Sequence, residues 1–517
     1  MSLAHTVGDI LGAIETAGSE EVAARARDAR DRLDQPLRVA VAGRVKAGKS
    51  TLLNALMGEA LAATDAAECT RLVTWYRHHP QYAAVAVHTD SRRSPLVLDR
   101  SDGGASIDVS AIDERSVSRL EVGVPSAKLE QLMLIDTPGL DSITEGVSER
   151  SHQFIAPQPG DQGADVLVFL MRYLHSEDAE FLEAFADPAA PSVDLVRAVA
   201  VLSRADELGS GRGDGLLVAD EVAGQYRRHP HLRRMVSEVY PVSGLLAFYA
   251  ASGTQREFDQ LAELADLPSE DLDRLLVSAH RFGADTNRLR SSGPQRAALV
   301  ERLGLPGVRM AVVAIRGGVV ANPRDLALLL EELSGIEPLR RMLLERFASR
   351  AATLKAARAL DLAEHLARDL GANDARRIGR RIERARLDAH ELRELDAIRL
   401  LLERDSDRVC GLSVDDLLQY LGHRGDAVGQ RLAPAVERAT GSLSLPDLVQ
   451  DLRTAASAGY ASRHDQDIVL TAATSIENVY YRVRAARDEA VAADAAPADA
   501  AHGRSDEALT EGEGDGV

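Results

Sequence analysis

The chain is poor in aromatic residues, cysteines and long apolar runs. Aromatic residues make up only 4% of the 517 residues while 45% are hydrophobic, a balance that favours long helices and still allows a sizeable core. Its two cysteines, Cys69 and Cys410, lie far apart without metal-type spacing, which is typical of a reduced cytoplasmic setting. No stretch approaches the roughly 18 apolar residues of a membrane span, so we expect any membrane contact to be peripheral.

The acidic balance of the chain narrows the choice of partners. Its formal net charge is −19, which argues against general binding of nucleic acid. Part of this charge lies in the low-complexity segment 488–517, which we expect to be a disordered acidic tail. The first residues lack the basic start of a signal peptide, in keeping with a cytoplasmic location.

A phosphate-binding loop follows the apolar run at residues 37–42. Its sequence is Gly43-Arg-Val-Lys-Ala-Gly-Lys-Ser50, and a helix-like segment comes directly after it. Glycines let backbone N–H groups turn toward the α- and β-phosphates, Lys49 supplies charge to the β- and γ-phosphates, and the Ser50 hydroxyl is a ligand for Mg²⁺. The loop therefore predicts a nucleoside triphosphate site made of Gly43, Lys46, Ala47, Gly48, Lys49, Ser50 and Thr51.

Two further segments complete the expected phosphate and metal site. Asp136-Thr-Pro-Gly139 follows the apolar run 132–135, which places a carboxylate where it can hold Mg²⁺ through water and a glycine N–H near the γ-phosphate. Thr70 lies between this segment and the phosphate-binding loop, where GTPases carry the threonine that closes on Mg²⁺. We expect Ser50, Thr70 and Asp136 to form the metal site.

Two later segments indicate which base is bound. Ser203-Arg204-Ala-Asp206 ends the apolar run 198–202, and the Asp206 carboxylate can accept hydrogen bonds from N1 and N2 of guanine, which adenine does not offer. Ser243 and Gly244 end a later strand and would direct a backbone N–H at the guanine carbonyl. Each string alone is weak, but five in the right order are strong and predict GTP.

The order of these motifs resembles that of the bacterial dynamin-like GTPases. The segments 67–75 and 242–247 look most like the actinobacterial isoniazid-inducible type, and the resemblance runs from about residue 37 to about residue 347. It implies hydrolysis of GTP to GDP and phosphate, with GTP and Mg²⁺ as cofactors. It also implies a G-domain homodimer, or a heterodimer with a dynamin-like paralogue, and peripheral association with the inner face of the cell membrane.

Two motifs depart from the family pattern. Dynamins carry Gln-Ser in the middle of the loop where this chain has Val45-Lys46, so the family mechanism cannot be copied onto it. Lys46, Lys49, Thr70 and Gly139 are the expected catalytic residues, with the Lys46 ammonium standing in for the cation that dynamins bind. Alternatively, Lys46 points to solvent or pairs with an acid. Arg204 replaces the usual lysine, and its planar guanidinium can stack over the purine.

The alternation of elements predicts an α/β fold: a doubly wound P-loop GTPase domain plus an all-α helical bundle, the neck and trunk. One amphipathic helix at 1–35 should join this bundle, with the GTPase domain at 36–340 and the bundle at 341–487. We expect a surface insertion at 90–108, and in the bundle a helix at 343–370, a turn and a returning helix over 378–402. Strands are expected at 37–42, 83–88, 120–124, 132–136, 165–171, 198–203 and 239–242.

Three functions are compatible with these features. The first is a mechanochemical membrane enzyme that couples GTP to membrane binding, remodelling or repair; the second is a nucleotide-gated scaffold with slow hydrolysis, paired with a paralogue; the third is a soluble assembly GTPase. An arginine cluster after the first turn of the bundle would lie at its tip and could contact anionic lipid. The alternative is a solvated helix face paired with Glu364, Asp369 and Glu383. The cluster comprises Arg376, Arg377, Arg380 and Arg381.

Overall fold

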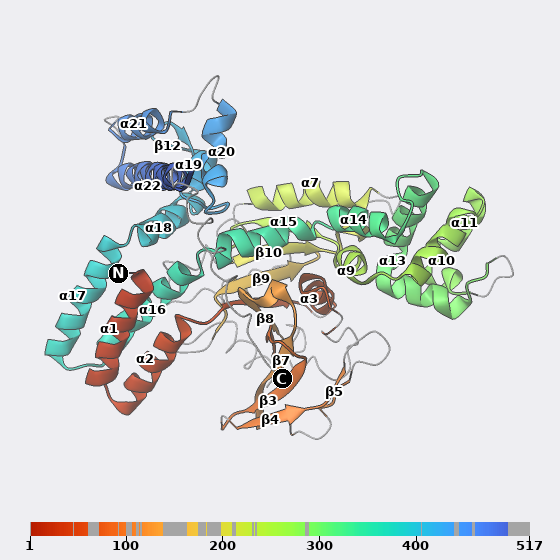
Figure 1. Ribbon diagram of the computed structural model, residues 1–517, viewed down its shortest axis with the longest axis horizontal. Coiled ribbons are helices and arrows are strands. Elements are labelled where there is room, and N and C mark those ends of the chain that lie inside the picture. Colours follow the sequence, from red (N-terminus) through yellow and green to blue (C-terminus); the bar gives the residue numbers. More distant parts are fainter. Residues whose placement is uncertain are drawn as a thin grey trace, which may run out of the picture.

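The computed structural model describes most of the chain as a central sheet flanked by helices on two sides (Figure 1). Of the expected site residues, Thr70 and Gly139 lie outside the described residues, as does Val45. The described residues are 2–44, 46–59, 61, 72–90, 92–99, 106–109, 113, 116–137, 163–173, 182, 198–208, 214–229, 232, 235–284, 289–404, 406–438, 444–457 and 461–494.

Five neighbouring strands of the nine-stranded sheet are parallel. In spatial order they are β11 (Val239–Val242), β10 (Ala198–Ser203), β9 (Val166–Met171), β1 (Leu37–Gly43) and β8 (Leu132–Asp136). Most of their residues are buried, as the near-continuous apolar runs predict for strands covered on both faces. Because the strands are parallel, the loops after them meet at one edge of the sheet.

The other half of the sheet is mixed and contains two strands that were not predicted. Spatially, β8 is followed by β2 (Thr74–His78), β7 (Val117–Val124), β3 (Ala83–His88) and β4 (Arg93–Leu96). The expected surface insertion at 90–108 is therefore partly wrong, because β4 pairs antiparallel with β3, and only the short hairpin of β5 (Leu98–Asp99) and β6 (Ser106–Ile107) stands apart. In β2, Trp75 is buried between the guanidinium groups of Arg38 and Arg119, 4.5 and 4.3 Å from its ring centre.

Helices cover both faces of the parallel half, so the predicted doubly wound α/β class is confirmed. One face packs against α3 (Lys49–Met57), α9 (Gly244–Ser252) and α15 (Ile336–Arg341), and the other against α7 (Gly215–Arg228). A helical arm extends beyond α9 and has a hydrophobic core of its own (Figure 1). It consists of α10 (Gln255–Ala265), α11 (Ser269–Leu275), α12 (Ala279–Phe282), α13 (Gly293–Arg316) and α14 (Pro323–Leu333).

The N-terminal segment forms two helices, so the prediction of one helix was wrong. After α1 (Leu3–Ala17) the backbone leaves the helical region at Gly18, and the Ser19 side chain accepts a hydrogen bond from the Val22 N–H to begin α2 (Glu20–Arg32). A serine after a glycine is a common way to start a second helix. Both helices share a core with α16 (Ala351–Ala367) and α17 (Ala372–Asp388), forming a four-helix group beside the sheet (Figure 1).

The long helices predicted after residue 340 are interrupted twice. A π-helical stretch, Met342–Ala348, separates α15 from α16, so the expected helix over 343–370 becomes α-helical only at Ala351. The expected helix over 378–402 also breaks: Ala389, at φ −88° and ψ 107°, separates α17 from α18 (His390–Leu402). The arginine-bearing helix therefore belongs to one helical group and α18 belongs to another.

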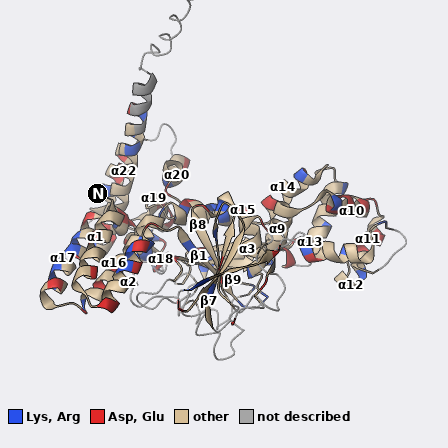
Figure 2. Ribbon diagram, turned by 60° about the horizontal axis from the view of Figure 1, so that its bottom comes forward, with Lys and Arg blue, Asp and Glu red and all other residues tan. Residues whose placement is uncertain are grey.

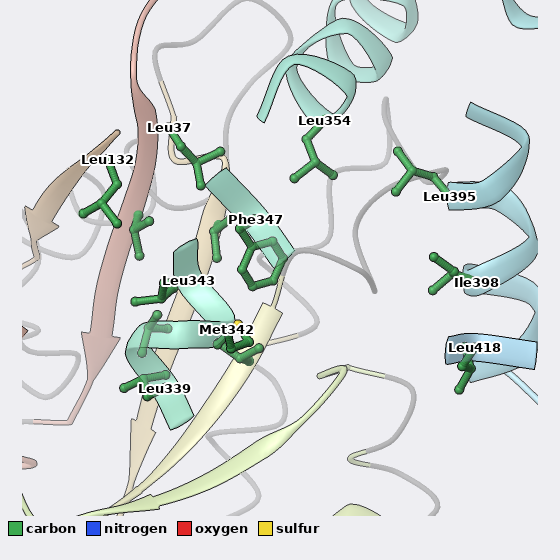
Figure 3. Packing of buried hydrophobic residues seen from close by; sticks show 14 of the residues in the cluster. Leu37, Leu132, Leu339, Met342, Leu343, Phe347, Leu354, Leu395, Ile398 and Leu418 are labelled. Atoms are coloured by element: carbon green, nitrogen blue, oxygen red, sulfur yellow. The ribbon is translucent and has the colours of Figure 1, made fainter. Parts of the chain in front are cut away.

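The second helical group shares the core of the sheet. It contains α18, α19 (Val414–Tyr420), α20 (Val428–Arg438), α21 (Leu445–Ala456) and α22 (Arg463–Asp494). Helix α22 continues past residue 487, where the tail was expected to begin, and residues 495–517 lie outside the described residues. Apolar side chains of the π-helical stretch, including Met342, Leu343 and Phe347, lie between the sheet and this group (Figure 3).

Candidate functional site

The phosphate-binding loop connects β1 to α3. Its first residue, Gly43, has φ 149°, and a Cβ there would lie 2.5 Å from a backbone carbonyl oxygen of β9, so only glycine fits. Gly48 is left-handed, at φ 95°, and is the N-cap of α3. The Lys49 ammonium donates to the carbonyls of Gly43 and Arg44, at 3.1 and 3.2 Å. The loop therefore closes around a lysine charge at a helix N-terminus, which suits an anion.

A carboxylate lies at the end of the strand beside this loop. Asp136 is paired in register with Val41 of β1, and the Thr137 hydroxyl donates to the Val41 carbonyl at 2.9 Å. Burial raises the pKa of Asp136 to about 6, and the charge of Lys49 opposes the shift only in part. With the Ser50 hydroxyl at the start of α3, these hard oxygen donors fit Mg²⁺, whose charge would stabilise the ionised carboxylate.

Four of the five expected base-binding residues, all but Ser243, line one cavity of about 250 Å³ beside the loop. Asp206 is 6% exposed, and burial raises its pKa while a hydrogen bond with the Ser243 side chain opposes the shift. The cavity thus brings the end of the phosphate-binding loop together with two later motifs. Its lining residues are Ala47, Gly48, Thr51, Leu52, Leu170, Val201, Ser203, Arg204, Asp206, Glu207, Val242, Gly244, Leu245 and Glu301.

Arg204 connects the base-binding segment to the middle of the phosphate-binding loop. Its backbone is left-handed, at φ 55°, and its guanidinium donates to the Lys46 carbonyl at 3.2 Å. It also pairs with Glu207 at 3.1 Å. The Lys46 backbone is left-handed too, at φ 64°, while its side chain is exposed. Arg204 and Lys46, which both depart from the family pattern, are thus joined by a hydrogen bond to the Lys46 backbone.

Ser243 and Gly244 lie at the start of α9, where Gly244 lines the cavity. Ser243 is fully buried, its side chain accepts a hydrogen bond from the Leu246 N–H at 3.4 Å, and its own N–H donates to the Ser334 carbonyl at 2.8 Å. A Cβ at Gly244 would lie 3.2 Å from Cγ2 of Thr51, so glycine lets α9 approach α3 closely. This packing brings the two halves of the site together.

Glu207 and Glu301 also line the cavity, and neither was predicted. Glu207 lies directly after the guanine motif, where its pairing with Arg204 is a local signal that could have been used. Glu301 lies in the middle of α13, far from every motif in sequence. Only the packing of the helical arm against α9 brings it to the site, so no sequence pattern marks it.

The four arginines predicted to face a membrane lie on α17, outside the nucleotide site. All four side chains are exposed. Arg376 donates to Asn373 at 2.8 Å and Arg377 pairs with Asp374 at 2.9 Å, whereas Arg380 and Arg381 have no acidic partner among the described residues. Figure 2 shows basic residues along α17 with acidic ones interspersed. None of the described helices combines the length and hydropathy needed to cross a bilayer.

A phosphate-binding loop, a carboxylate on the adjacent strand and the acid predicted to bind the base, two strands away, have the GTPase arrangement of motifs. The model of the dynamin family matches residues 39–197. The isoniazid-induced protein IniC of Mycobacterium tuberculosis is 38% identical over 329 residues, which cover 64% of this chain and 66% of that protein. A bacterial dynamin-like protein of Nostoc punctiforme is 28% identical over 147 residues, covering 26% of this chain and 20% of that one.

The chain is similar to IniC and to the bacterial dynamin-like proteins, which confirms the predicted resemblance. The matched region spans just under two thirds of the length of IniC. Among solved structures, a chain of an oligomerised bacterial dynamin pair, described as a mechanism for long-range sensing and tethering of membranes, matches with 13% identity and a TM-score of 0.33. That match covers 95% of this chain and 75% of the other.

Proposed function

We propose that the chain is a GTPase that couples GTP binding and hydrolysis to contact with an anionic membrane at the inner face of the cell. The observation that supports this most directly is the single cavity shared by the phosphate-binding loop and Asp206. Similarity to the dynamin family adds the expectation of pairing through the GTPase domain, with a second copy or a dynamin-like paralogue. In the cavity, Asp206 would accept hydrogen bonds from guanine N1 and N2, and an adenine edge would leave it unpaired.

Calorimetric titration of the full chain with GTP and with ATP, both with Mg²⁺, tests the choice of base. We expect a preference for GTP of at least about a hundredfold, because an unpaired buried acceptor is expensive. Asp206→Asn should reduce this preference, while Asp220→Asn, on an exposed position of α7, should leave it unchanged. Equal binding of ATP and GTP by the unmodified chain would refute the proposal.

For hydrolysis, Lys49 would hold the β- and γ-phosphates, and Ser50 and Asp136 would hold Mg²⁺, with Thr70 as a further ligand. Mg²⁺ would neutralise charge that develops on the phosphate oxygens. Lys49→Ala and Ser50→Ala should therefore abolish turnover in a phosphate-release assay and leave the fold intact. Arg204 donates to the Lys46 carbonyl, and the Lys46 side chain is exposed. We propose that its ammonium turns to the phosphates when GTP binds and replaces a bound cation there.

Turnover in K⁺ and in Na⁺ tests the role of Lys46. We expect equal rates in the two salts, and a loss of about 10- to 1,000-fold in turnover for Lys46→Ala with little loss of GTP binding. A strong requirement for K⁺, or an unchanged mutant, would contradict this role. Slow turnover in the unmodified chain would instead favour the nucleotide-gated scaffold, which the absence of the Gln-Ser pair at positions 45 and 46 supports.

For membrane contact we propose the exposed arginine cluster of α17. Each arginine near an anionic surface contributes about 1 kcal/mol, so four together could hold an acidic protein at a membrane. In the structure, Arg377 pairs with Asp374, and the one apolar residue between the four arginines, Ile378, is buried in the helical group. Nearby on α17, Arg386 pairs with Asp361 and Glu364. The pairing with Glu364 agrees with the alternative, in which this helix face is solvated and its arginines pair with acids.

Sedimentation with acidic liposomes tests this contact. Changing Arg376, Arg377, Arg380 and Arg381 to Glu should release the chain from the vesicles and leave basal turnover unchanged. The matched control changes four exposed arginines of the helical arm to Glu, which alters the net charge equally; these are Arg256, Arg274, Arg281 and Arg324. If both variants pellet equally, the α17 cluster is not the contact.

A further inference from the structure

Helix α13 of the arm forms part of the wall of the nucleotide cavity although it carries no nucleotide motif. Glu301 of α13 lines the cavity together with Arg204 and Asp206. The other acids of the lining are engaged, since Glu207 pairs with Arg204 and Asp206 is hydrogen-bonded to the Ser243 side chain. Among the residues that the structure describes, no hydrogen bond or ion pair engages the Glu301 carboxylate, which is exposed at the mouth of the cavity.

The neighbours of Glu301 hold it in this position. Arg302 donates to the Ser252 carbonyl at 2.8 Å and pairs with Glu257 at 2.8 Å, which ties α13 to the end of α9 and the start of α10. Two residues later α13 is broken at Gly304, with φ 72° and ψ 159°, and a Cβ there would lie 3.8 Å from Oδ2 of Asp206. The break therefore lies directly beside the base-binding carboxylate, one helical turn from Glu301.

We propose that Glu301 is a specificity residue for the nucleoside, whose carboxylate accepts a hydrogen bond from a neutral donor of guanosine. Two donors have this chemistry: the amino hydrogen of guanine that Asp206 does not use, and a ribose hydroxyl. Phosphate groups carry the wrong charge for an acidic partner, and the phosphate-binding loop with its Lys49 charge is the part of the site expected to hold them. This inference rests on the proposed binding of GTP, and it makes the helical arm part of the nucleotide site.

Calorimetric titrations of the full chain with GTP, ITP, 2′-deoxyGTP and 3′-deoxyGTP, all with Mg²⁺, test the proposal. Glu301→Ala should weaken GTP binding about tenfold, because it removes a hydrogen bond whose acceptor is a charged carboxylate. If the donor is the amino group, ITP should bind equally to both proteins; if it is a ribose hydroxyl, one of the deoxynucleotides should. Glu301→Gln keeps an acceptor oxygen and should retain most of the affinity.

The control is Glu332→Ala, which removes an exposed acid of α14 that does not line the cavity. Unchanged GTP affinity in Glu301→Ala would overturn the inference, as would an equal loss for all four nucleotides, which would mark a general change in the cavity. Failure of the unmodified chain to bind GTP is a separate outcome, because it would overturn the proposed function itself.

Discussion

Two carboxylates, Asp136 at the C-terminal end of a central strand and Glu394 between helices, have pKa values shifted in opposite directions. Glu394 of α18 accepts hydrogen bonds from Arg350 at 3.0 Å, from Arg431 at 2.7 and 3.0 Å and from Ser475 at 2.7 Å. Burial alone would raise its pKa, but its hydrogen bonds and the two guanidinium charges hold that pKa far below the usual range. For Asp136, burial prevails and raises the pKa to about 6.

The difference separates a structural acid from one that fits a ligand site. The charge of Glu394, on α18, is balanced by two arginines of the same chain. Arg350 lies directly before α16 and Arg431 lies on α20, and both form ion pairs with the Glu394 carboxylate. Among the described residues, Lys49 alone is a charge that lowers the pKa of Asp136, and its ammonium also contacts the loop carbonyls. A carboxylate that the fold leaves undercompensated at the end of a parallel strand is suited to an external cation, whereas a fully paired one stabilises the fold.

The largest expected effect comes from removing Glu394. Glu394→Ala leaves Arg350 and Arg431 buried without their acid, so we expect a loss of about 3–5 kcal/mol in the free energy of unfolding, measured by urea denaturation without nucleotide. Glu391→Ala, an exposed acid three residues earlier on α18, is the control and should change stability by less than about 0.5 kcal/mol.

Acid should weaken the Glu394 cluster in a defined range. Because the pKa of Glu394 in the folded chain lies below its usual value of 4.5, its contribution to stability is complete above pH 4.5 and is lost as pH falls below that value. The unmodified chain should therefore lose stability there more steeply than Glu394→Ala. Parallel profiles for the two proteins would show that the cluster does not stabilise the fold, and the contrast with Asp136 would disappear.

An opposite and smaller effect is expected for Asp136. Its pKa is raised from 3.8 to about 6, so the ionised carboxylate destabilises the nucleotide-free fold, increasingly as pH rises from 3.8 through 6. Asp136→Asn should increase the free energy of unfolding by about 1–3 kcal/mol at pH 8, and by about half as much at pH 5. The same variant should lose the Mg²⁺-dependent part of GTP affinity. A destabilised Asp136→Asn at pH 8 would show that the carboxylate is already paired.

The smallest expected effect tests the support of Asp206. Ser243→Ala removes both the N-cap of α9 and a hydrogen bond to the Asp206 side chain, and should cost about 1–2 kcal/mol in thermal or urea unfolding. Ser292→Ala, which removes the exposed cap of α13 alone, provides the comparison and should cost less. An equal cost for the two variants would mean that the bond to Asp206 adds no stability.

Sequence was most informative where function depends on short local strings. The seven predicted strands are all present, and most of their residues are apolar and buried in the sheet. Strand β2 was missed since Arg77 and His78 are exposed and interrupt its apolar pattern, and β4 since it contains Pro95 and lies at the sheet edge. The base motif could be predicted because it is a local string, in which Asp206 lies two positions after Arg204.

Features that depend on packing were not predictable. Glu301 reaches the cavity through the contact of α13 with α9, and its own sequence neighbourhood carries no nucleotide signal. The break at Ala389 has neither glycine nor proline to mark it. By contrast, the break before α2 was marked by Gly18 and Ser19, a recognisable helix stop followed by a cap, and could have been predicted.

The π-helical stretch has a consequence for how the protein can be divided. Met342, Leu343 and Phe347 belong to one core with the strand residue Leu37 and with Ile398 of α18, so the same side chains cover the sheet and support the helices (Figure 3). A fragment ending at residue 340 would lack these side chains and would expose an apolar surface of the sheet. We therefore expect chains truncated near this position to aggregate. In the intact chain, the sheet and the second helical group should unfold in a single transition. Movement of these helices should also move the sheet, because no flexible linker separates them at the π-helical stretch.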